Sequence, residues 1–331
     1  MTSRPALGVP ALIVANAAAS RLSDTGARAR LLALVASAVT ARTGSEPTCV
    51  EAVSASMLEA VIAAARDGGA PLVVVVGGDG TVRTAAGLLA GSGVPLGLVP
   101  AGTGNLLAAA LGIPRAPKGA AAALRTLPPR TIDLGAVRIH RGGGPASPDD
   151  VDERFTVACG AGFDAAVMAA TSGDAKRRLG VGAYFAAAAR LMGDARPIHL
   201  RIDVDGVTLK TDGIVALVAN CGDLVPGVVR PRVPLDPADG LLELLVLRGG
   251  GPIGAIQAAL ELLAARAPNA PGAASARSMR LRGRVISVVP DPPVALQVDG
   301  DPYPAGWFTA SVMPGALRIL APLAGDPRPV G

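Results

Sequence analysis

Aromatic residues are scarce in this chain: four Phe, two Tyr and one Trp occur among 331 residues. Half of the residues are apolar, so the chain can bury a large core, but Ala, Val and Leu must build it. A core of small aliphatic residues is typical of α/β layers, in which helices pack closely against a sheet. The length favours two domains over one.

Cysteine is also scarce, and its pattern excludes two classes of protein. Cys49, Cys159 and Cys221 are far apart, no CxxC pair occurs, and the chain has only two histidines. These features argue against a disulfide framework and against a Cys/His zinc site. Each cysteine lies in or beside an apolar, strand-like run, so we expect all three to be small buried core residues.

Long apolar runs are missing. No stretch of about 18 or more apolar residues occurs, and residues 1–10 lack the apolar region of a signal peptide, so we expect a cytoplasmic protein. The net charge of +5 suits an anionic ligand or peripheral contact with the inner face of a membrane, although a solvated basic surface explains it more simply. We expect no nucleic-acid partner, and the sequence leaves a homodimer open.

Strand-like and helix-like segments alternate through residues 1–130. Apolar, mostly β-branched runs predict strands at 11–16, 48–53, 73–76 and 95–99. Helical patterns lie between them, at 26–42, 56–66, 82–90 and 106–111. This alternation predicts a doubly wound, mostly parallel α/β sheet, with its ligand crevice beyond the carboxyl ends of the strands.

From residue 131 onward the pattern changes to closely spaced strands. We expect them at 131–140, 154–159, 198–204, 207–212, 214–219 and 241–247, with further short strands through 277–320. Helices are expected at 176–192 and 252–265, and Asp205-Gly206 predicts a two-residue hairpin turn. Residues 131–309 are therefore predicted to form a mainly antiparallel β-sandwich with a few helices. The last strands, about 310–322, remain open as an addition to the first domain.

The predicted strand at 73–76 ends in Gly77-Gly78-Asp79-Gly80-Thr81. Glycines at such a turn let the N–H groups of a helix N-terminus approach phosphate oxygens. Asp79 could hold a metal–phosphate group or orient a hydroxyl, and Thr81 could cap the helix. The turn lacks the lysine of a Walker A loop and the dinucleotide fingerprint. A tight strand-to-helix corner without a ligand explains the same residues.

A second glycine turn follows the next predicted strand, as Pro100-Ala101-Gly102-Thr103-Gly104-Asn105, and Asn16 ends the first strand. The carboxyl ends of parallel strands meet at one edge of a sheet, so these segments should converge. Two glycine turns at adjacent strand ends predict a phosphate cradle. The candidate nucleotide-binding residues are Asn16, Gly77, Gly78, Asp79, Gly80, Thr81, Gly102, Thr103 and Asn105.

Together these motifs resemble the catalytic domain of the diacylglycerol kinase family. Gly-Gly-Asp-Gly-Thr is shared with sphingosine kinases, NAD kinases and phosphofructokinases, whereas residues 98–105 are similar to the diacylglycerol kinase group specifically. Further segments similar to the family's follow in order at 133–135, 160–164, 176–184, 235–242 and 297–301. The resemblance therefore covers nearly the whole chain.

The resemblance implies a nucleotide-binding α/β domain, a β-sandwich and a lipid cleft between them. It also implies transfer of the ATP γ-phosphate to the hydroxyl of diacylglycerol or a similar long-chain lipid alcohol. By resemblance, the glycine loop and Thr103 bind ATP, and the acid of an Asp-Gly-acid turn is the general base. Asp239, with backbone carbonyls of Asp236 and Leu241, is similar to the family's structural Mg²⁺ site.

The chemistry of the reaction agrees with this implication. A lipid hydroxyl is a poor nucleophile until a carboxylate near the γ-phosphate accepts its proton. The turn Asp299-Gly300-Asp301 offers two such acids, and we prefer Asp299 because the family pattern is intact there, with Asp301 as the alternative. The candidate catalytic residues are thus Asp79, Asp299 and Asp301. A hairpin turn with no catalytic role explains an Asp-Gly pair equally well.

Two other functions compete with lipid phosphorylation. An NAD kinase-like enzyme shares the first glycine loop, but the second loop and the C-terminal acid turn argue against it. A non-catalytic lipid-binding protein would keep the fold, but the intact Asp79 and Asp299 argue against that. The sequence does not identify the lipid.

Overall fold

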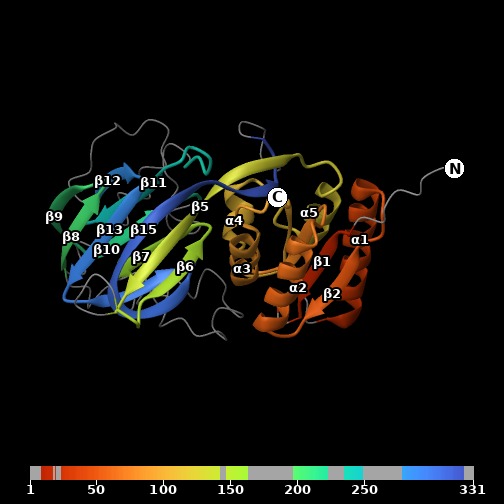
Figure 1. The fold of residues 1–331 in the computed structure, drawn as a ribbon, viewed down its shortest axis with the longest axis horizontal. Helices are drawn as coiled ribbons and strands as arrows, with labels where there is room; N and C mark the ends of the chain where they lie inside the picture. The colour runs from red at the N-terminus through yellow and green to blue at the C-terminus, as the bar shows by residue number, and fades with distance from the viewer. Residues whose placement is uncertain are drawn as a thin grey trace. The chain divides into compact units, whose positions relative to one another are not determined.

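The computed structural model describes residues 9–17, 19, 24–141, 147–162, 197–222, 235–248 and 278–323. The chain divides into two compact units, coloured along the sequence in Figure 1. The first unit comprises Met1–Ile132 with Gly315–Gly331, and the second comprises Asp133–Pro314. Expectations for 163–164, 176–192, 223–227 and 252–265 lie outside the described residues.

The first unit contains a parallel sheet, as the alternating pattern predicts. Its strands, in spatial order, are β2 (Thr48–Ala52), β1 (Leu12–Asn16), β3 (Val73–Gly77) and β4 (Leu96–Pro100). Figure 1 shows the helices gathered about these strands: α1 (Thr25–Thr43), α2 (Ala55–Asp67), α3 (Asp79–Leu89), α4 (Leu106–Ala110) and α5 (Pro117–Ala123). Val73 to Val76 are fully buried because parallel strands are covered on both faces.

The strand order places a topological switch point between β1 and β3. The chain runs from β1 outward to β2, then crosses back over β1 to β3 and continues to β4. At a switch point the two connections leave the sheet in opposite directions, which opens a crevice at the carboxyl ends. Asn16 ends β1 and Gly77 ends β3, so Asn16 and the first predicted phosphate-binding turn lie at this crevice, and the second turn follows the neighbouring strand β4.

The second unit is built from antiparallel strands, which confirms the β-sandwich. One set pairs in the order β12 (Ser278–Gly283), β11 (Leu242–Leu247), β10 (Val215–Ala219), β7 (Ala158–Gly162) and β14 (Val294–Val298). The other pairs in the order β9 (Val207–Gly213), β8 (Ile198–Val204), β13 (Val285–Asp291), β15 (Asp301–Leu320), β5 (Pro129–His140) and β6 (Val151–Phe155). Their alternating inward side chains, Phe155 and Phe308 among them, form one apolar core.

Some strand boundaries differ from the expectation. The expected strand 154–159 is wrong: β6 ends at Phe155 and β7 begins at Ala158. The short strands expected from 277 onward are confirmed in β12, β13 and β14, but the last strand, β15, is 20 residues long rather than short. Its last part lies in the first unit, where Ile319 pairs with Leu96 of β4 in parallel. The Asp205-Gly206 turn is confirmed, since both residues have positive φ between β8 and β9.

Two features of the first unit were not anticipated. Helix α5 begins with Pro117 in its first turn and continues through alanines, both of which favour a helix. Cys49 is exposed, so the expectation that it is buried is wrong, whereas Cys159 and Cys221 are buried. Cys49 lies on β2, which ends the parallel sheet and leaves more of its surface to solvent. None of the described helices has the length and apolar character needed to cross a membrane.

Candidate functional site

The first glycine turn leads directly into helix α3. Gly78 is the N-cap, with no side-chain cap, so the N–H groups of Asp79, Gly80 and Thr81 form the positive end of the helix. Thr81 lies inside the helix and is buried, so its expected role as the cap is wrong. Its hydroxyl accepts a hydrogen bond of 2.9 Å from the side-chain amide of Asn16. This bond joins the ends of β1 and β3.

The carboxylate of Asp79 ties the first turn to the second. Its oxygens accept hydrogen bonds from the backbone N–H groups of Asn105, at 2.8 Å, and Leu106, at 2.6 Å. Asn105 has a left-handed backbone, with φ of 53°, and its buried side chain bonds both the N–H and the C=O of Gly102. The second turn is therefore held in shape by Asn105 and held in place by Asp79.

Glycine is required where the two turns meet. A Cβ on Gly102 would lie 2.6 Å from the Cα of Gly78, and a Cβ on Gly104 would lie 2.6 Å from a carboxylate oxygen of Asp79. A Cβ essentially never lies this close to another heavy atom, so a larger residue at Gly102 would shift the backbone and one at Gly104 would displace the Asp79 carboxylate. This close approach explains the glycines better than turn conformation does, because neither Gly78 nor Gly102 has positive φ.

The substitution Gly102→Ala should therefore destabilise the first unit by about 1–3 kcal/mol, as overpacking of a close contact does. Gly80→Ala is the matched control, because its Cβ would meet nothing within 4 Å in the first turn of α3. That change should be neutral or stabilising by up to about 1 kcal/mol. Chemical denaturation of both variants measures the difference. Equal stabilities would show that the turns do not depend on this contact.

A pocket of about 440 Å³ lies over the first turn, within the first unit. Asn16, Gly78 to Thr81 and Gly102 line one side of it, and residues 52–55 with Leu58 line the other. Of the predicted nucleotide-binding residues, Gly77, Thr103 and Asn105 do not line this pocket. The wall from β2 and α2 was missed, although β2 neighbours β1 in the sheet and its carboxyl end meets the same crevice.

The turn Asp299-Gly300 joins β14 to β15, and both residues have positive φ, as in a two-residue hairpin. The Asp299 carboxylate accepts four hydrogen bonds of 2.7–3.0 Å, from the N–H groups of Thr156, Val157 and Ala158 and the hydroxyl of Thr156. Desolvation raises the pKa of Asp299, and these bonds oppose that rise. The N–H donors belong to the residues between β6 and β7 and to the first residue of β7. The Asp299 carboxylate therefore holds the β14–β15 turn against this segment.

Asp301 has a different environment from Asp299. It is exposed at the first position of β15, whereas Asp299 directs both carboxylate oxygens at protein donors. The two acids therefore do not share a face, as they would on one strand. Of the two predicted bases, Asp301 is the more accessible to an external hydroxyl, because Asp299 is half-buried and hydrogen-bonded.

The predicted magnesium site lies in the loop 236–241. One carboxylate oxygen of Asp239 accepts the N–H of Leu241 and the other pairs with Arg282. The Asp236 carboxylate accepts the N–H of Ala238, and no group of three or more His, Cys, Asp or Glu among the described residues could hold a metal ion. The Asp239 carboxylate is thus paired with Arg282, and the magnesium site built on it with the backbone carbonyls of Asp236 and Leu241 stays a prediction.

Two family descriptions match this chain. Residues 10–137 match the diacylglycerol kinase catalytic domain. Residues 157–321 match the YegS C-terminal NAD kinase beta sandwich-like domain. The first match contains both glycine turns and the second contains the Asp299-Gly300-Asp301 turn.

Individual relatives agree with these matches. The chain is 30% identical to the protein named "Probable lipid kinase YegS-like" of Stenotrophomonas maltophilia, over 81% of this chain and 84% of that one. It is 28% identical to a diacylglycerol kinase of Mycobacterium tuberculosis, over 80% and 81%. It spans 56% of a longer Synechocystis protein at 26% identity. A solved diacylglycerol kinase of Bacillus anthracis shares the fold, with a TM-score of 0.68, 14% identity and coverage of 96% and 98%.

Proposed function

Because the chain belongs to the diacylglycerol kinase catalytic-domain family, we propose that it is an ATP-dependent lipid kinase. It transfers the γ-phosphate of ATP to the hydroxyl of diacylglycerol or a similar long-chain lipid alcohol. The observation that carries this proposal is the bridge from Asp79 to Asn105 and Leu106, beside the pocket over the first turn. That bridge fixes two glycine turns around one space, which positioning of a triphosphate requires.

The first unit supplies the groups that would bind the nucleotide. The N-terminal N–H groups of α3 line the pocket and carry the partial positive charge that favours a phosphate. The Asn16–Thr81 bond keeps the end of β1 beside that helix terminus. Mg²⁺ that enters with ATP would offset phosphate charge during transfer. The turns then act by holding the phosphates in a fixed orientation, which is the main requirement of phosphoryl transfer.

The second unit supplies the candidate base. The acceptor hydroxyl must lose its proton as the new P–O bond forms, and a carboxylate can accept that proton. We assign this role to Asp301, because it is exposed, and we assign to Asp299 the role of fixing the turn that presents it. This reverses the preference from the sequence, which rested on the intact family residue rather than on the environment of either side chain.

The lipid acceptor of the proposed reaction also indicates where in the cell the protein acts. A long-chain lipid alcohol stays in the bilayer, so the protein must reach its substrate at a membrane surface. The net charge of +5 favours a surface that contains anionic lipids. We therefore propose peripheral membrane contact during turnover.

The direct test is phosphate transfer from radiolabelled ATP. Purified protein is incubated with Mg²⁺ and γ-labelled ATP, with vesicles that contain diacylglycerol, other vesicles that contain sphingosine or monoacylglycerol, and soluble NAD as separate acceptors. We expect label in a lipid product and none in NAD. Label in NADP alone would support the NAD kinase-like alternative. Vesicle binding without any transfer would support the non-catalytic one.

A further inference from the structure

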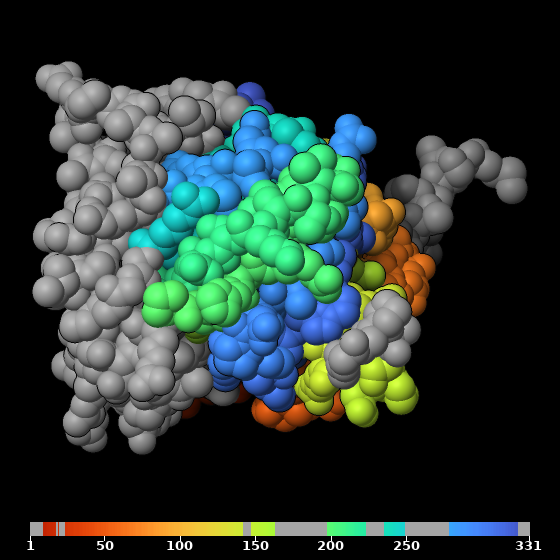
Figure 2. Space-filling view, turned by 90° about the vertical axis from the view of Figure 1, so that its left-hand side faces the viewer, coloured from red at the N-terminus to blue at the C-terminus, as the bar shows by residue number. Residues whose placement is uncertain are grey.

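The second unit has a recess of its own, of about 1000 Å³, lined entirely by residues of that unit. Parts of β5, β8, β9, β13 and β15 line it. Figure 2 shows β8 and β9, in green, crossing this face beside the strands coloured blue. None of its lining residues is a predicted site residue. Its volume is in the range of small-molecule sites.

Two cations face each other on one side of the recess. Arg201 of β8 lies directly opposite Lys210 of β9 in the antiparallel register, and both side chains are exposed. Like charges in this position repel, which destabilises a strand pair unless an anion lies between them. Neither cation has an ion pair with any residue in the described part of the chain. On its other side Arg201 is opposite Val289 of β13, which offers no compensating charge.

The acids of the recess lie two residues further along the same strands, beside His199 instead of Arg201. Asp212 is opposite His199, and their side chains are 2.6 Å apart, so this carboxylate is already engaged. Asp291 of β13, the other strand that pairs with β8, is also opposite His199. Arg141 adds a third cation to the lining. The positive charge is therefore concentrated toward Arg201 and Lys210, while the acids group about His199.

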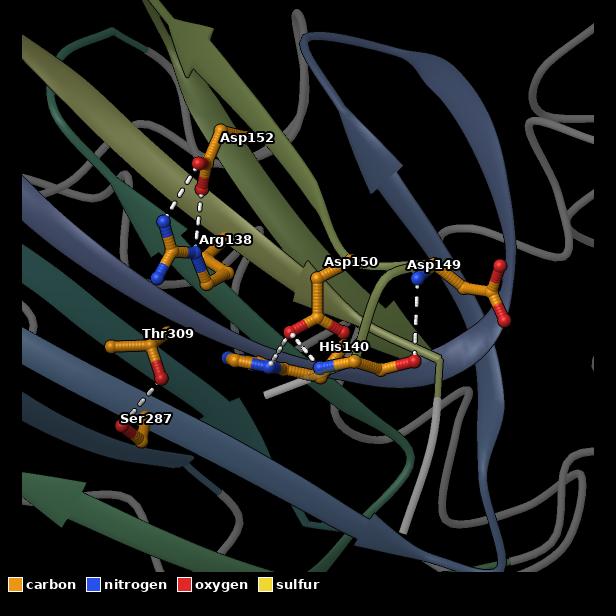
Figure 3. Close-up of polar contacts among 8 residues, drawn as sticks. Arg138, His140, Asp149, Asp150, Asp152, Ser287 and Thr309 are labelled. Atoms are coloured by element: carbon orange, nitrogen blue, oxygen red, sulfur yellow. Dashed lines mark hydrogen bonds and ion pairs between the residues drawn. The ribbon is translucent and has the colours of Figure 1, made fainter. Parts of the chain in front are cut away.

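The lining also includes an aromatic pair, His140 and Trp307, from neighbouring strands of the same sheet. The imidazole of His140 stacks on the indole of Trp307, with ring centroids 3.6 Å apart and an interplanar angle of 13°. His140 is buried, and its Nδ1 lies 2.9 Å from the carboxylate of Asp150, which also accepts the N–H of Ser147. Figure 3 shows the His140–Asp150 contact beside the double hydrogen bond from Arg138 to Asp152. These contacts fix the ring plane that Trp307 presents to the recess.

We propose that this recess binds a small soluble organic anion, a phosphate or carboxylate group joined to a flat apolar body. The anion lies between Arg201 and Lys210, where a guanidinium and an ammonium together match a phosphate or carboxylate. The apolar body lies against Trp307 and the nearby Val289 and Pro290. A concave site suits such a molecule better than it suits a flat bilayer surface. The inference does not rest on the kinase activity proposed above.

Trp307 makes the test direct, because it is the only tryptophan in the chain. Its emission, excited selectively, is titrated with phenyl phosphate, inorganic phosphate and benzyl alcohol, without ATP or lipid. We expect a saturable change with phenyl phosphate, at a concentration about tenfold or more below that needed for inorganic phosphate. Benzyl alcohol, which lacks the charge, should produce no saturable change. An emission change seen only with phosphatidylglycerol vesicles would overturn the proposal.

Two matched double variants distinguish binding in the recess from a general effect of positive surface charge. The double variant Arg201→Gln with Lys210→Gln should raise the Kd for phenyl phosphate at least tenfold, because it removes both charged donors. The control, Lys118→Gln with Arg284→Gln, also removes two exposed cations but none from the recess. It should leave the Kd unchanged, and thermal denaturation should show both variants folded. An unchanged Kd in the first variant, or an equal increase in both, would contradict the assignment.

Discussion

Replacement of Asp79 by Ala should abolish phosphate transfer, with a loss of at least about 100-fold, while the protein stays folded. The Asp79 carboxylate is the only group among the described contacts that accepts from both Asn105 and Leu106. Without it the second turn is no longer fixed to the first. A displacement of about 1 Å of a positioning group costs about 100-fold in rate. Since phosphoryl transfer depends on positioning, the effect should be on kcat as well as on ATP affinity.

Asp79→Asn sharpens this prediction, because an amide keeps the size of the side chain but has only one acceptor oxygen. Its NH₂ group would face one of the two N–H donors, so activity should again fall steeply. Asp67→Asn is the matched control: it removes an exposed acid of α2 that pairs only with its neighbour Arg66 among the described contacts. Labelled-ATP transfer and circular dichroism are measured for all three. Near wild-type activity in the Asp79 variants would show that the bridge between the turns is not needed.

The parts of the site that follow from local pattern were predictable. The continuous β-branched run Val73 to Val76 predicts a buried parallel strand, and the glycines after it predict a turn at its carboxyl end. Strand order supplies the remaining step, because parallel strands bring their carboxyl ends to one edge. The sequence therefore identifies both glycine turns at this edge of the sheet without knowledge of any contact between them.

The functions of individual acids were not predictable in the same way, because they depend on contacts between distant segments. Asp79 bonds residues 26 and 27 positions later, and Asp299 bonds residues 141 to 143 positions earlier. No periodicity or turn signal encodes such partners. The same holds for His140: its partner ring, Trp307, follows on a strand near the other end of the chain.

Asp299→Asn and Asp301→Asn are expected to have opposite effects: the first should lower the free energy of unfolding, and the second should lower kcat. At Asp299, an amide would leave at least one of the four donors from Thr156, Val157 and Ala158 without an acceptor. Each unsatisfied buried donor costs about 1–3 kcal/mol, so the free energy of unfolding should fall by about 3 kcal/mol. At the exposed Asp301 the free energy of unfolding should change by less than about 0.5 kcal/mol. There kcat should instead fall by about 10²–10⁴-fold, as when a general base is removed.

Denaturation and kinetics must therefore be measured on both variants, at a temperature where each is folded. The Asp301 variant should have a normal denaturation midpoint, low kcat and little change in KM, because an exposed base acts on the transition state rather than on substrate binding. The Asp299 variant should have a lower midpoint and keep much of its kcat while folded, since in this proposal its carboxylate positions the turn and Asp301 is the base. If the Asp301 variant turned over normally and the folded Asp299 variant did not, the base would be Asp299. The four donors would then have to release its carboxylate during the reaction.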